Sequence, residues 1–129
     1  MILAIDYGTK RIGLAIADES GAIPLPFKEM ANKGRDLVLQ EIEEIIKVEK
    51  INIVVVGLPI NLAGIASQKT LETQKFIDSL SKKIFVPVIK IDERFTSRLS
   101  DTMSLGTEGS RDVGAAMIIL EDYLQRQKI

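Results

Sequence analysis

The sequence opens with the run Met1-Ile-Leu-Ala-Ile-Asp6-Tyr-Gly8-Thr9-Lys10-Arg11-Ile-Gly13, which leads from apolar residues to a carboxylate, a glycine and two cations. Apolar residues at successive positions are typical of a strand that is buried on both faces of a sheet. We therefore expect Asp6 to lie where a first strand leaves the core. Gly8 lacks a Cβ, which allows another backbone or a phosphate to approach closely. A carboxylate in this setting, with Lys10 and Arg11 nearby, suits a metal ion held against a phosphate.

The same run is also compatible with a purely structural role. Asp-x-Gly is ordinary turn chemistry, and aspartate is common where strands end. The first thirteen residues alone leave both interpretations of Asp6 open.

The composition narrows the chemistry that the chain can perform. Of its 129 residues, 46% are hydrophobic and 27% charged, which is ordinary for a globular domain with its own core. There is no cysteine and no histidine, which excludes disulfides, thiolate metal sites, Ser-His triads and the commonest zinc ligand. Catalysis would then depend on carboxylates, hydroxyls, Lys, Arg, Tyr or a bound oxygen-preferring ion such as Mg²⁺ or Mn²⁺. The net charge of −1 argues against a uniformly basic nucleic-acid surface, although a local basic face remains compatible with it.

Hydrophobic periodicity and turn signals predict a single α/β domain over residues 1–129. The predicted strands cover about residues 2–6, 11–18, 22–28, 52–56 and 86–91. The predicted helices cover about residues 34–50 and 67–83, a short segment capped by Thr96 and Ser97 that ends near Gly106, and residues 111–126. No apolar run is long enough to cross a membrane and no basic leader precedes the first strand, so we expect a cytoplasmic protein.

The order of these elements predicts how they pair. Strand, helix, strand implies parallel pairing with a right-handed crossover, and residues 57–64 are expected to form a loop at the carboxyl end of a central strand. Pro24 and Pro26 predict that the third strand lies at an edge of the sheet. Asp18 is expected to form the hairpin turn before it.

Several faces are predicted to be buried. Gly13, Ala15 and Ala17 alternate with bulky residues, so another element should pack closely on that side of the second strand. The inward residues predicted for the last two long helices are Leu71, Gln74, Ile77, Leu80 and Ile84, followed by Ala116, Ile119, Leu120 and Tyr123.

Three acids lie at ends of predicted elements: Asp6, Glu93 and Asp112. Parallel strands bring their carboxyl ends to one edge of a sheet, and a following helix can begin there. Alternation along the strand puts Glu93 on one face with Ile91 and puts Asp92 on the other. Three carboxylates that converge would repel one another unless a cation neutralised them, which predicts a divalent-metal site. The alternative for Asp112 is that it complements the dipole of the helix it begins.

Four motifs carry a resemblance to a known family. They are Asp6-Tyr-Gly8-Thr-Lys-Arg11-Ile-Gly13-Leu-Ala15, Gly57-Leu-Pro59, Asp92-Glu93-Arg94-Phe-Thr96-Ser97 and Asp112-Val-Gly-Ala115-Ala116-Met-Ile-Ile119-Leu120. In this order and spacing they resemble the YqgF family of Holliday-junction-resolvase-like proteins, regarded as nucleases that mature the 5′ end of pre-16S ribosomal RNA. Each motif is weak alone, but together they span essentially the whole chain.

The resemblance implies a ribonuclease H-like fold. Its five-stranded mixed sheet has an antiparallel 1-2-3 meander, with parallel strands added beside strand 1 and helices on its flanks. The resemblance also implies that Asp6, Glu93 and Asp112 are the catalytic, metal-binding acids. The chain departs from the family at three places: Thr96-Ser97 replaces a common Thr-Thr pair, residues 106–110 carry no basic residue, and Ala115 stands where related junction resolvases have a fourth carboxylate.

The resulting hypothesis is a metal-dependent phosphodiesterase of ribosome biogenesis that acts on structured nucleic acid, with pre-ribosomal RNA favoured. With two Mg²⁺ or Mn²⁺ ions about 3.5–4 Å apart, Asp6 and Glu93 would hold the one that activates water, and Asp6 and Asp112 the one that stabilises the leaving oxygen. The candidate phosphate contacts are the nearby cations Lys10, Arg11, Lys69, Arg94, Arg98 and Arg111. Arg94 alternatively forms a salt bridge that orients Asp92 or Glu93.

Other functions stay open. One is a Holliday junction resolvase that acts on DNA. Another is an actin-like ATPase or sugar-kinase-like domain, because Asp-x-Gly-Thr also opens those folds, although they need two such domains to close around a nucleotide. A third is an RNA-binding or transcription-associated module with a vestigial site, against which the three intact acids argue. The sequence leaves open whether the chain forms a homodimer.

Overall fold

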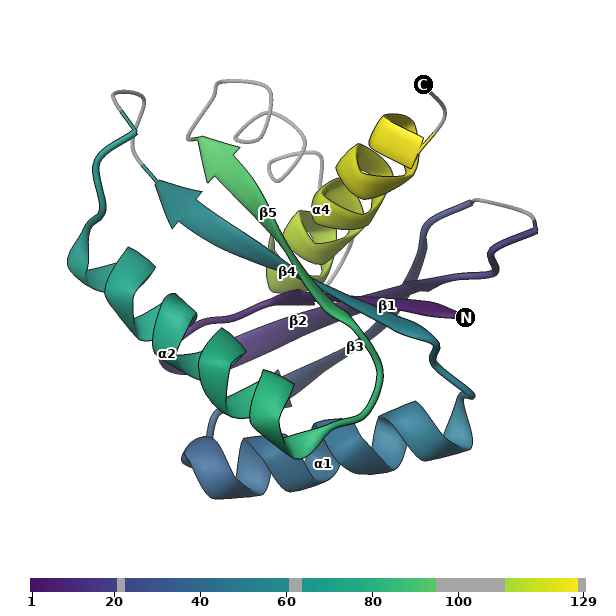
Figure 1. The fold of residues 1–129 in the computed structure, drawn as a ribbon, viewed down its shortest axis with the longest axis horizontal. Helices are drawn as coiled ribbons and strands as arrows, with labels where there is room; N and C mark the ends of the chain where they lie inside the picture. The colour runs from purple at the N-terminus through teal and green to yellow at the C-terminus, as the bar shows by residue number, and fades with distance from the viewer. Residues whose placement is uncertain (21–22, 61–63, 95–110, 128–129) are drawn as a thin grey trace.

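The computed structural model describes residues 1–20, 23–60, 64–94 and 111–127 (Figure 1). In these ranges the strands are β1 (Ile2–Asp6), β2 (Arg11–Ala17), β3 (Leu25–Ala31), β4 (Ile53–Ile60) and β5 (Val88–Arg94). The helices in the same ranges are α1 (Arg35–Val48), α2 (Gln68–Lys83) and α4 (Arg111–Gln127). None of these helices has the length and hydrophobicity that a membrane span requires.

The five strands form one mixed sheet in the order β3-β2-β1-β4-β5. β2 pairs antiparallel with both β1 and β3, whereas β4 pairs parallel with β1 and with β5. The predicted architecture, a meander with parallel strands added beside the first strand, is confirmed.

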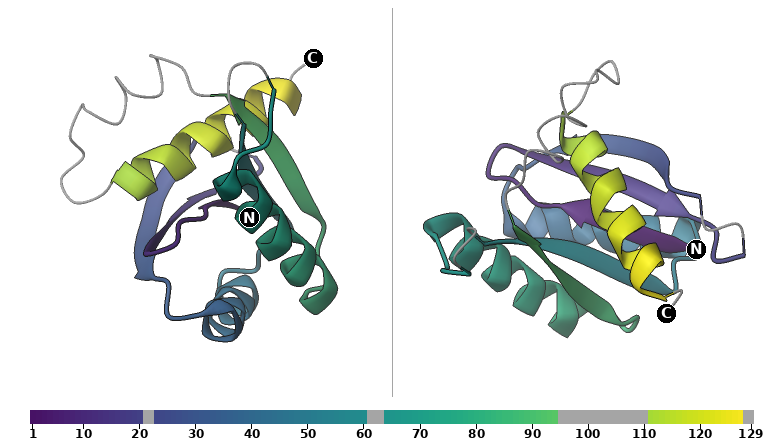
Figure 2. Two further views of the ribbon diagram at one scale, coloured as in Figure 1. Left: turned by 90° about the vertical axis from the view of Figure 1, so that its left-hand side faces the viewer. Right: turned by 90° about the horizontal axis from the view of Figure 1, so that it is seen from above.

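Helices cover both faces of this sheet, with α1 and α2 on one side and α4 on the other (Figure 2). The side chains of β1 are divided between two cores. Leu3 and Ile5 pack with residues of α1 and α2, whereas Ile2 and Ala4 pack with residues of α4. Burial on both faces explains why β1 carries apolar residues at every position before Asp6.

The small side chains of β2 face α4, as the sequence predicts. Ala15 and Ala17 belong to the core that α4 forms with the sheet. Gly13 lies under the first turn of α4, where a Cβ would collide with the backbone of Asp112. The helix therefore approaches this strand more closely than a larger residue would permit.

The third strand begins and ends three residues later than the predicted range of 22–28. Its pairing with β2 has a register shift between Leu14 and Ala15, opposite the segment that includes Pro26. Met30, near the far end, is buried opposite Ile12 and anchors this later register. β3 is an edge strand, which confirms the prediction from the prolines.

The predicted loop over residues 57–64 is wrong in its first half, because β4 continues through Ile60. Leu58, Pro59 and Ile60 pair with residues of β5, which likewise extends to Arg94. The pairing of β1 with β4 ends at Val56, so within the described residues β4 has no strand partner on that side beyond it. A proline is tolerated there because no ladder hydrogen bond is lost.

The buried face of α2 also differs from the prediction. Ile77, Leu80 and the following Ile84 are buried as expected, but Leu71 is 52% exposed. Thr70, Thr73 and Phe76 are buried instead. The two threonines can lie inward because their hydroxyls are satisfied: Thr70 donates to the carbonyl of Pro59, and Thr73 donates to that of Lys69 at 2.8 Å.

Two further predictions have different outcomes. Asp18 forms the predicted turn, because its Oδ1 accepts from the backbone N–H and the hydroxyl of Ser20 at 3.0 Å each. The short helix predicted after Thr96 and Ser97, and the predicted loop over residues 106–110, lie outside the described residues.

Candidate active site

Asp6 and Asp112 are brought together by the glycine between them. Asp6 ends β1 and pairs in register with Gly13 of β2. Asp6 follows the parity of Ile2 and Ala4, so its side chain belongs to the face that α4 covers. The backbone of Asp112 lies directly on Gly13, and α4 begins one residue earlier. The first turn of α4 is therefore adjacent to the end of β1.

Glu93 reaches the same face of the sheet from β5. It pairs with Pro59 of β4, and its Cγ would lie 3.4 Å from a Cβ placed on Gly57. The same hypothetical Cβ would lie 2.9 Å from Cγ1 of Ile119 on α4, which places Glu93 at the α4 face. Asp92 is exposed, and the parity prediction for this pair of acids is confirmed.

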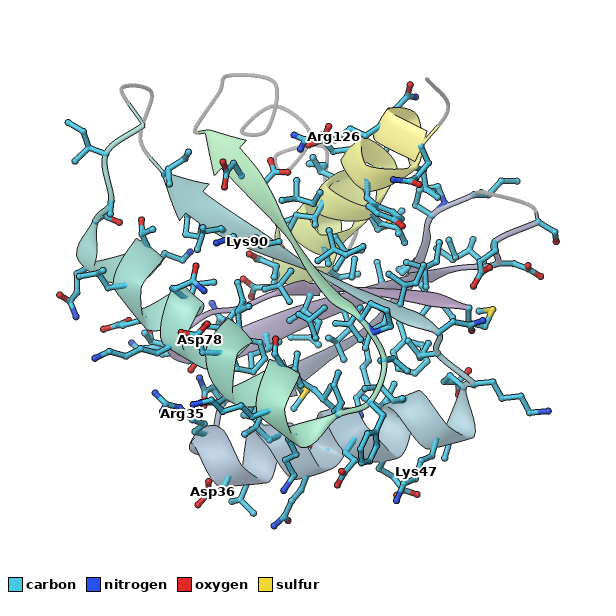
Figure 3. All side chains as sticks on the ribbon, in the orientation of Figure 1. Arg35, Asp36, Lys47, Asp78, Lys90 and Arg126 are labelled. Atoms are coloured by element: carbon cyan, nitrogen blue, oxygen red, sulfur yellow. The ribbon has the colours of Figure 1, made fainter. Side chains whose placement is uncertain are left out.

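Lys90 lies on the opposite face of β5 from Glu93. Its ammonium donates to Oε1 of Gln74 on α2 at 3.4 Å, on the side of the sheet away from α4 (Figure 3). β5 thus alternates between α2 and α4, with Lys90 facing the first and Glu93 the second.

The environment of Asp6 disfavours its ionised form. Burial raises the pKa of Asp6 from the ordinary 3.8 to about 6. The ammonium of Lys69, in the first turn of α2, lowers this pKa, and the carboxylate of Asp112 raises it. Both neighbours act on the carboxylate electrostatically, so Asp6 is within electrostatic reach of a cation on α2 and an anion on α4.

Glu93 faces a fourth acid that the sequence reasoning missed. The pKa of Glu93 is raised from 4.5 to about 7, first by burial and then by the charge of Asp122 and a hydrogen bond shared with it. Arg126 lowers this pKa, and the charge of Asp6 raises it. Arg126, near the end of α4 (Figure 3), donates to Oδ2 of Asp122 at 3.0 Å. Carboxylates therefore lie along the α4 face from the start of the helix to its last turns.

The donor set suits an oxygen-preferring divalent ion. Oε1 of Glu93 is buried and has no hydrogen-bond donor, and Asp6 and Glu93 each have an acidic neighbour whose charge raises their pKa. Within the described ranges, however, no three acidic side chains stand in an arrangement that could hold a metal ion. The assignment of Asp6, Glu93 and Asp112 as metal ligands stays a prediction, and their side chains would have to move closer together to share an ion.

The six candidate phosphate contacts separate into three groups. Lys10 and Lys69 line one groove beside Asp112. Arg11 also lines it, but its Nε lies 3.4 Å from Oδ2 of Asp112 and 3.6 Å from Oε1 of Glu29. The remaining candidates are not described in their side chains: Arg94 ends β5, Arg111 begins α4, and Arg98 lies wholly outside the described residues.

A five-stranded sheet of this order, with acids from β1, β5 and α4 gathered on the face that α4 covers, defines the chain as a ribonuclease H-like α/β protein. Solved structures support this class. T. thermophilus RuvC in complex with Holliday junction substrate has a TM-score of 0.66 at 12% identity, over 98% of this chain and 95% of that one. The fowlpox virus resolvase in complex with Holliday junction DNA has a TM-score of 0.61 at 11% identity, over 98% and 97%. These likenesses concern the fold.

The family follows from the sequence. A family model described as RuvX, Holliday junction resolvase, matches residues 1–126, and the chain belongs to this family. A protein of Maridesulfovibrio salexigens named "Putative pre-16S rRNA nuclease" is 37% identical, over 97% of this chain and 98% of its own. A protein of the same name from Sulfurihydrogenibium sp. is 35% identical, over 97% and 90%. The predicted resemblance is thereby confirmed.

Proposed function

We propose that the chain is a metal-dependent endonuclease that cleaves the precursor of 16S ribosomal RNA. The names of its relatives supply the substrate, and the acids on the α4 face supply the chemistry. The observation that carries the proposal is the position of Asp6, which is partly buried at the end of a central strand, within electrostatic reach of Asp112 and Lys69. A turn residue has no need of this environment, because burial of a carboxylate without a neutralising partner costs free energy.

Each acid has a role that its position supports. Asp6, Glu93 and Asp112 would hold the ion or ions, and Asp6 is central because it interacts with both of the others. Bound Mg²⁺ or Mn²⁺ supplies activation of water and stabilisation of the leaving oxygen. Gly13 lets the first turn of α4 lie close to β2, because a Cβ there would collide with the backbone of Asp112. Gly57 leaves room for Ile119 of α4 beside Glu93.

A cleavage assay tests the proposal. Wild-type protein with Mg²⁺ or Mn²⁺ is expected to cut an RNA that spans the 5′ end of 16S ribosomal RNA. Asp6→Asn should lose several orders of magnitude in rate, because it removes the carboxylate shared by both ion positions. Asp92→Asn is the matched control for Glu93→Gln, since the two residues are adjacent but lie on opposite faces of β5. Equal rates for wild type and Asp6→Asn would refute the assignment.

The family description gives one specific reason to include DNA. The matching family is described as Holliday junction resolvases, so a four-way DNA junction belongs in the same assay as the RNA. Cleavage of the junction in preference to the RNA would assign the activity to DNA with the same acids.

A further inference from the structure

A groove opens beside Asp112, on the edge of the sheet where β1 ends. The loop after β1 forms one of its sides, and the first turns of α2 form the other. Its volume is about 470 Å³, within the range of ordinary ligand sites. The lining residues are Gly8, Thr9, Lys10, Arg11, Gln68, Lys69, Glu72 and Asp112.

The loop side is held in place by Asn32. Its side-chain amide donates to the carbonyl of Gly8 at 2.8 Å and to the hydroxyl of Tyr7 at 3.3 Å, and its backbone N–H donates to the carbonyl of Lys10 at 2.9 Å. Within the loop, a Cβ on Gly8 would collide with the carbonyl of Arg11, so the turn closes tightly on itself. These contacts fix the path of the backbone that carries Lys10.

The helix side is anchored as well. Ser67 and Thr70 form a capping box at the start of α2, and Thr70 also donates to the carbonyl of Pro59 in β4. The two sides are joined beneath the groove, because Tyr7 stacks on Phe76 of α2 with ring centroids 4.2 Å apart. The positions of Lys10 and Lys69 relative to each other are therefore set by the fold.

The cations of the groove differ in whether they have acidic partners. Arg11 is paired with Asp112 and Glu29. Neither Lys10 nor Lys69 forms an ion pair within the described part of the chain, and Lys69 acts on Asp6 only electrostatically. Two unpaired ammonium groups on opposite sides of one groove would neutralise an anion that lies between them. They would also offset the repulsion between that anion and the two acids that line the groove, Glu72 and Asp112.

We propose that this groove binds the sugar–phosphate backbone of the RNA strand to be cut, with Lys10 and Lys69 contacting its phosphates from the two sides. This inference rests on the proposed nuclease function. The strand then passes Asp6 and Asp112 at the end of the groove. Thr9 and Gln68 add neutral hydrogen-bonding groups, which suits contacts to sugar and phosphate without selection of particular bases.

Binding of RNA to metal-free protein tests the groove separately from cleavage. A fluorescently labelled single-stranded RNA from the 5′ end of the 16S precursor and, in parallel, a labelled four-way DNA junction are titrated in EDTA at several salt concentrations. The variants are Lys10→Gln with Lys69→Gln, and a control that replaces Lys82 and Lys83 by Gln. The control lysines lie exposed in the last turn of the same helix and change the net charge equally. A second control, Lys10→Arg with Lys69→Arg, keeps the charge.

The groove variant should bind roughly tenfold more weakly at low salt. Its plot of log affinity against log salt should flatten by about 0.7 for each phosphate that the protein no longer neutralises. The control and the arginine version should bind as wild type does, and all melting temperatures should agree. Wild-type affinity and slope in the groove variant would overturn this proposal, as would an equal loss of affinity in the control. A loss of affinity confined to a four-way DNA junction would overturn the RNA assignment. Failure of wild type to cleave any nucleic acid would refute the proposed function instead.

Discussion

The backbone of Asp112 packs directly against the Cα of Gly13. A methyl group on Gly13 would collide with the carbonyl of Asp112 and would lie 2.6 Å from the backbone nitrogen of Val113. Because Gly13 also pairs with Asp6, one glycine determines how close two of the candidate acids can come. The first turn of a helix is too stiff to yield locally, so the whole of α4 would have to move.

Gly13→Ala should therefore destabilise the protein by about 1–3 kcal/mol, the usual cost of overpacking a well-filled interior. Urea unfolding of the purified variant measures this change. Gly57→Ala is the matched comparison, because its Cβ would meet the side chain of Ile119, which can rotate away. It should cost less than Gly13→Ala. Equal stability of Gly13→Ala and wild type would contradict the close approach of α4.

Asp6→Asn should raise or preserve the melting temperature of the metal-free protein. The wild-type carboxylate is disfavoured by burial and by the charge of Asp112, and the amide removes both costs. Addition of Mg²⁺ should raise the melting temperature of wild type, because an ion that binds only the folded state stabilises it. The variant should respond weakly. If Asp6 had only a structural role in the turn, the result would be the reverse. The variant would melt well below wild type, and Mg²⁺ would not change the melting temperature of wild type.

The stability of the metal-free protein should fall as the pH rises from about 4 to about 7. An acid with a higher pKa in the folded state binds more protons there than in the unfolded state, so the free energy of unfolding decreases with pH across that window. The window extends from 3.8 to about 6 for Asp6 and from 4.5 to about 7 for Glu93. Melting curves at a series of pH values in EDTA measure the effect. Saturating Mg²⁺ should flatten the dependence, because cation binding favours the ionised acids.

Two substitutions on α4 should change the contribution of Glu93 to the pH dependence of stability in opposite directions. Asp122→Asn removes the anion that raises the pKa of Glu93, so the pH dependence between 6 and 8 should shrink. Arg126→Gln removes the cation that lowers this pKa, so the dependence should grow. NMR titration of the Glu93 carboxyl would measure both shifts directly. Shifts of the same sign in the two variants would contradict this arrangement of charges.

Much of the fold could be predicted because the decisive patterns are local. Alternation along β5 places Glu93 and Lys90 on opposite faces without any knowledge of the helices. The extension of β4 past Gly57 could not be predicted in this way. Among the described strands only β5 pairs with its last residues, and the partner of a strand end is not visible in its own sequence.

The residues of the candidate site likewise differ in whether the local sequence could predict them. Asp6 and Glu93 end apolar runs, which is a signal that the sequence displays. Asp122 lies in the middle of an amphipathic helix and looks like any solvated acid. Its role depends on which turn of α4 lies beside Glu93, a property of the packing between a helix and a strand. Its spacing of three from Ile119, an expected inward residue, was the only available hint.

Arg11→Gln should tighten the binding of a divalent ion while leaving stability nearly unchanged. The Arg11 side chain is 65% exposed, and its Nε lies 3.4 Å from Asp112 and 3.6 Å from Glu29, so it can turn from one acid to the other. Exposed pairs of this kind contribute at most ~1 kcal/mol, and the guanidinium competes with an incoming cation for Asp112. The gain in affinity for Mn²⁺ should therefore reach no more than about fivefold. Calorimetric titration with Mn²⁺ measures it, and Arg35→Gln, an exposed change at the start of α1, is the control. Weaker Mn²⁺ binding in Arg11→Gln than in wild type would show instead that Arg11 holds Asp112 in the orientation that an ion needs.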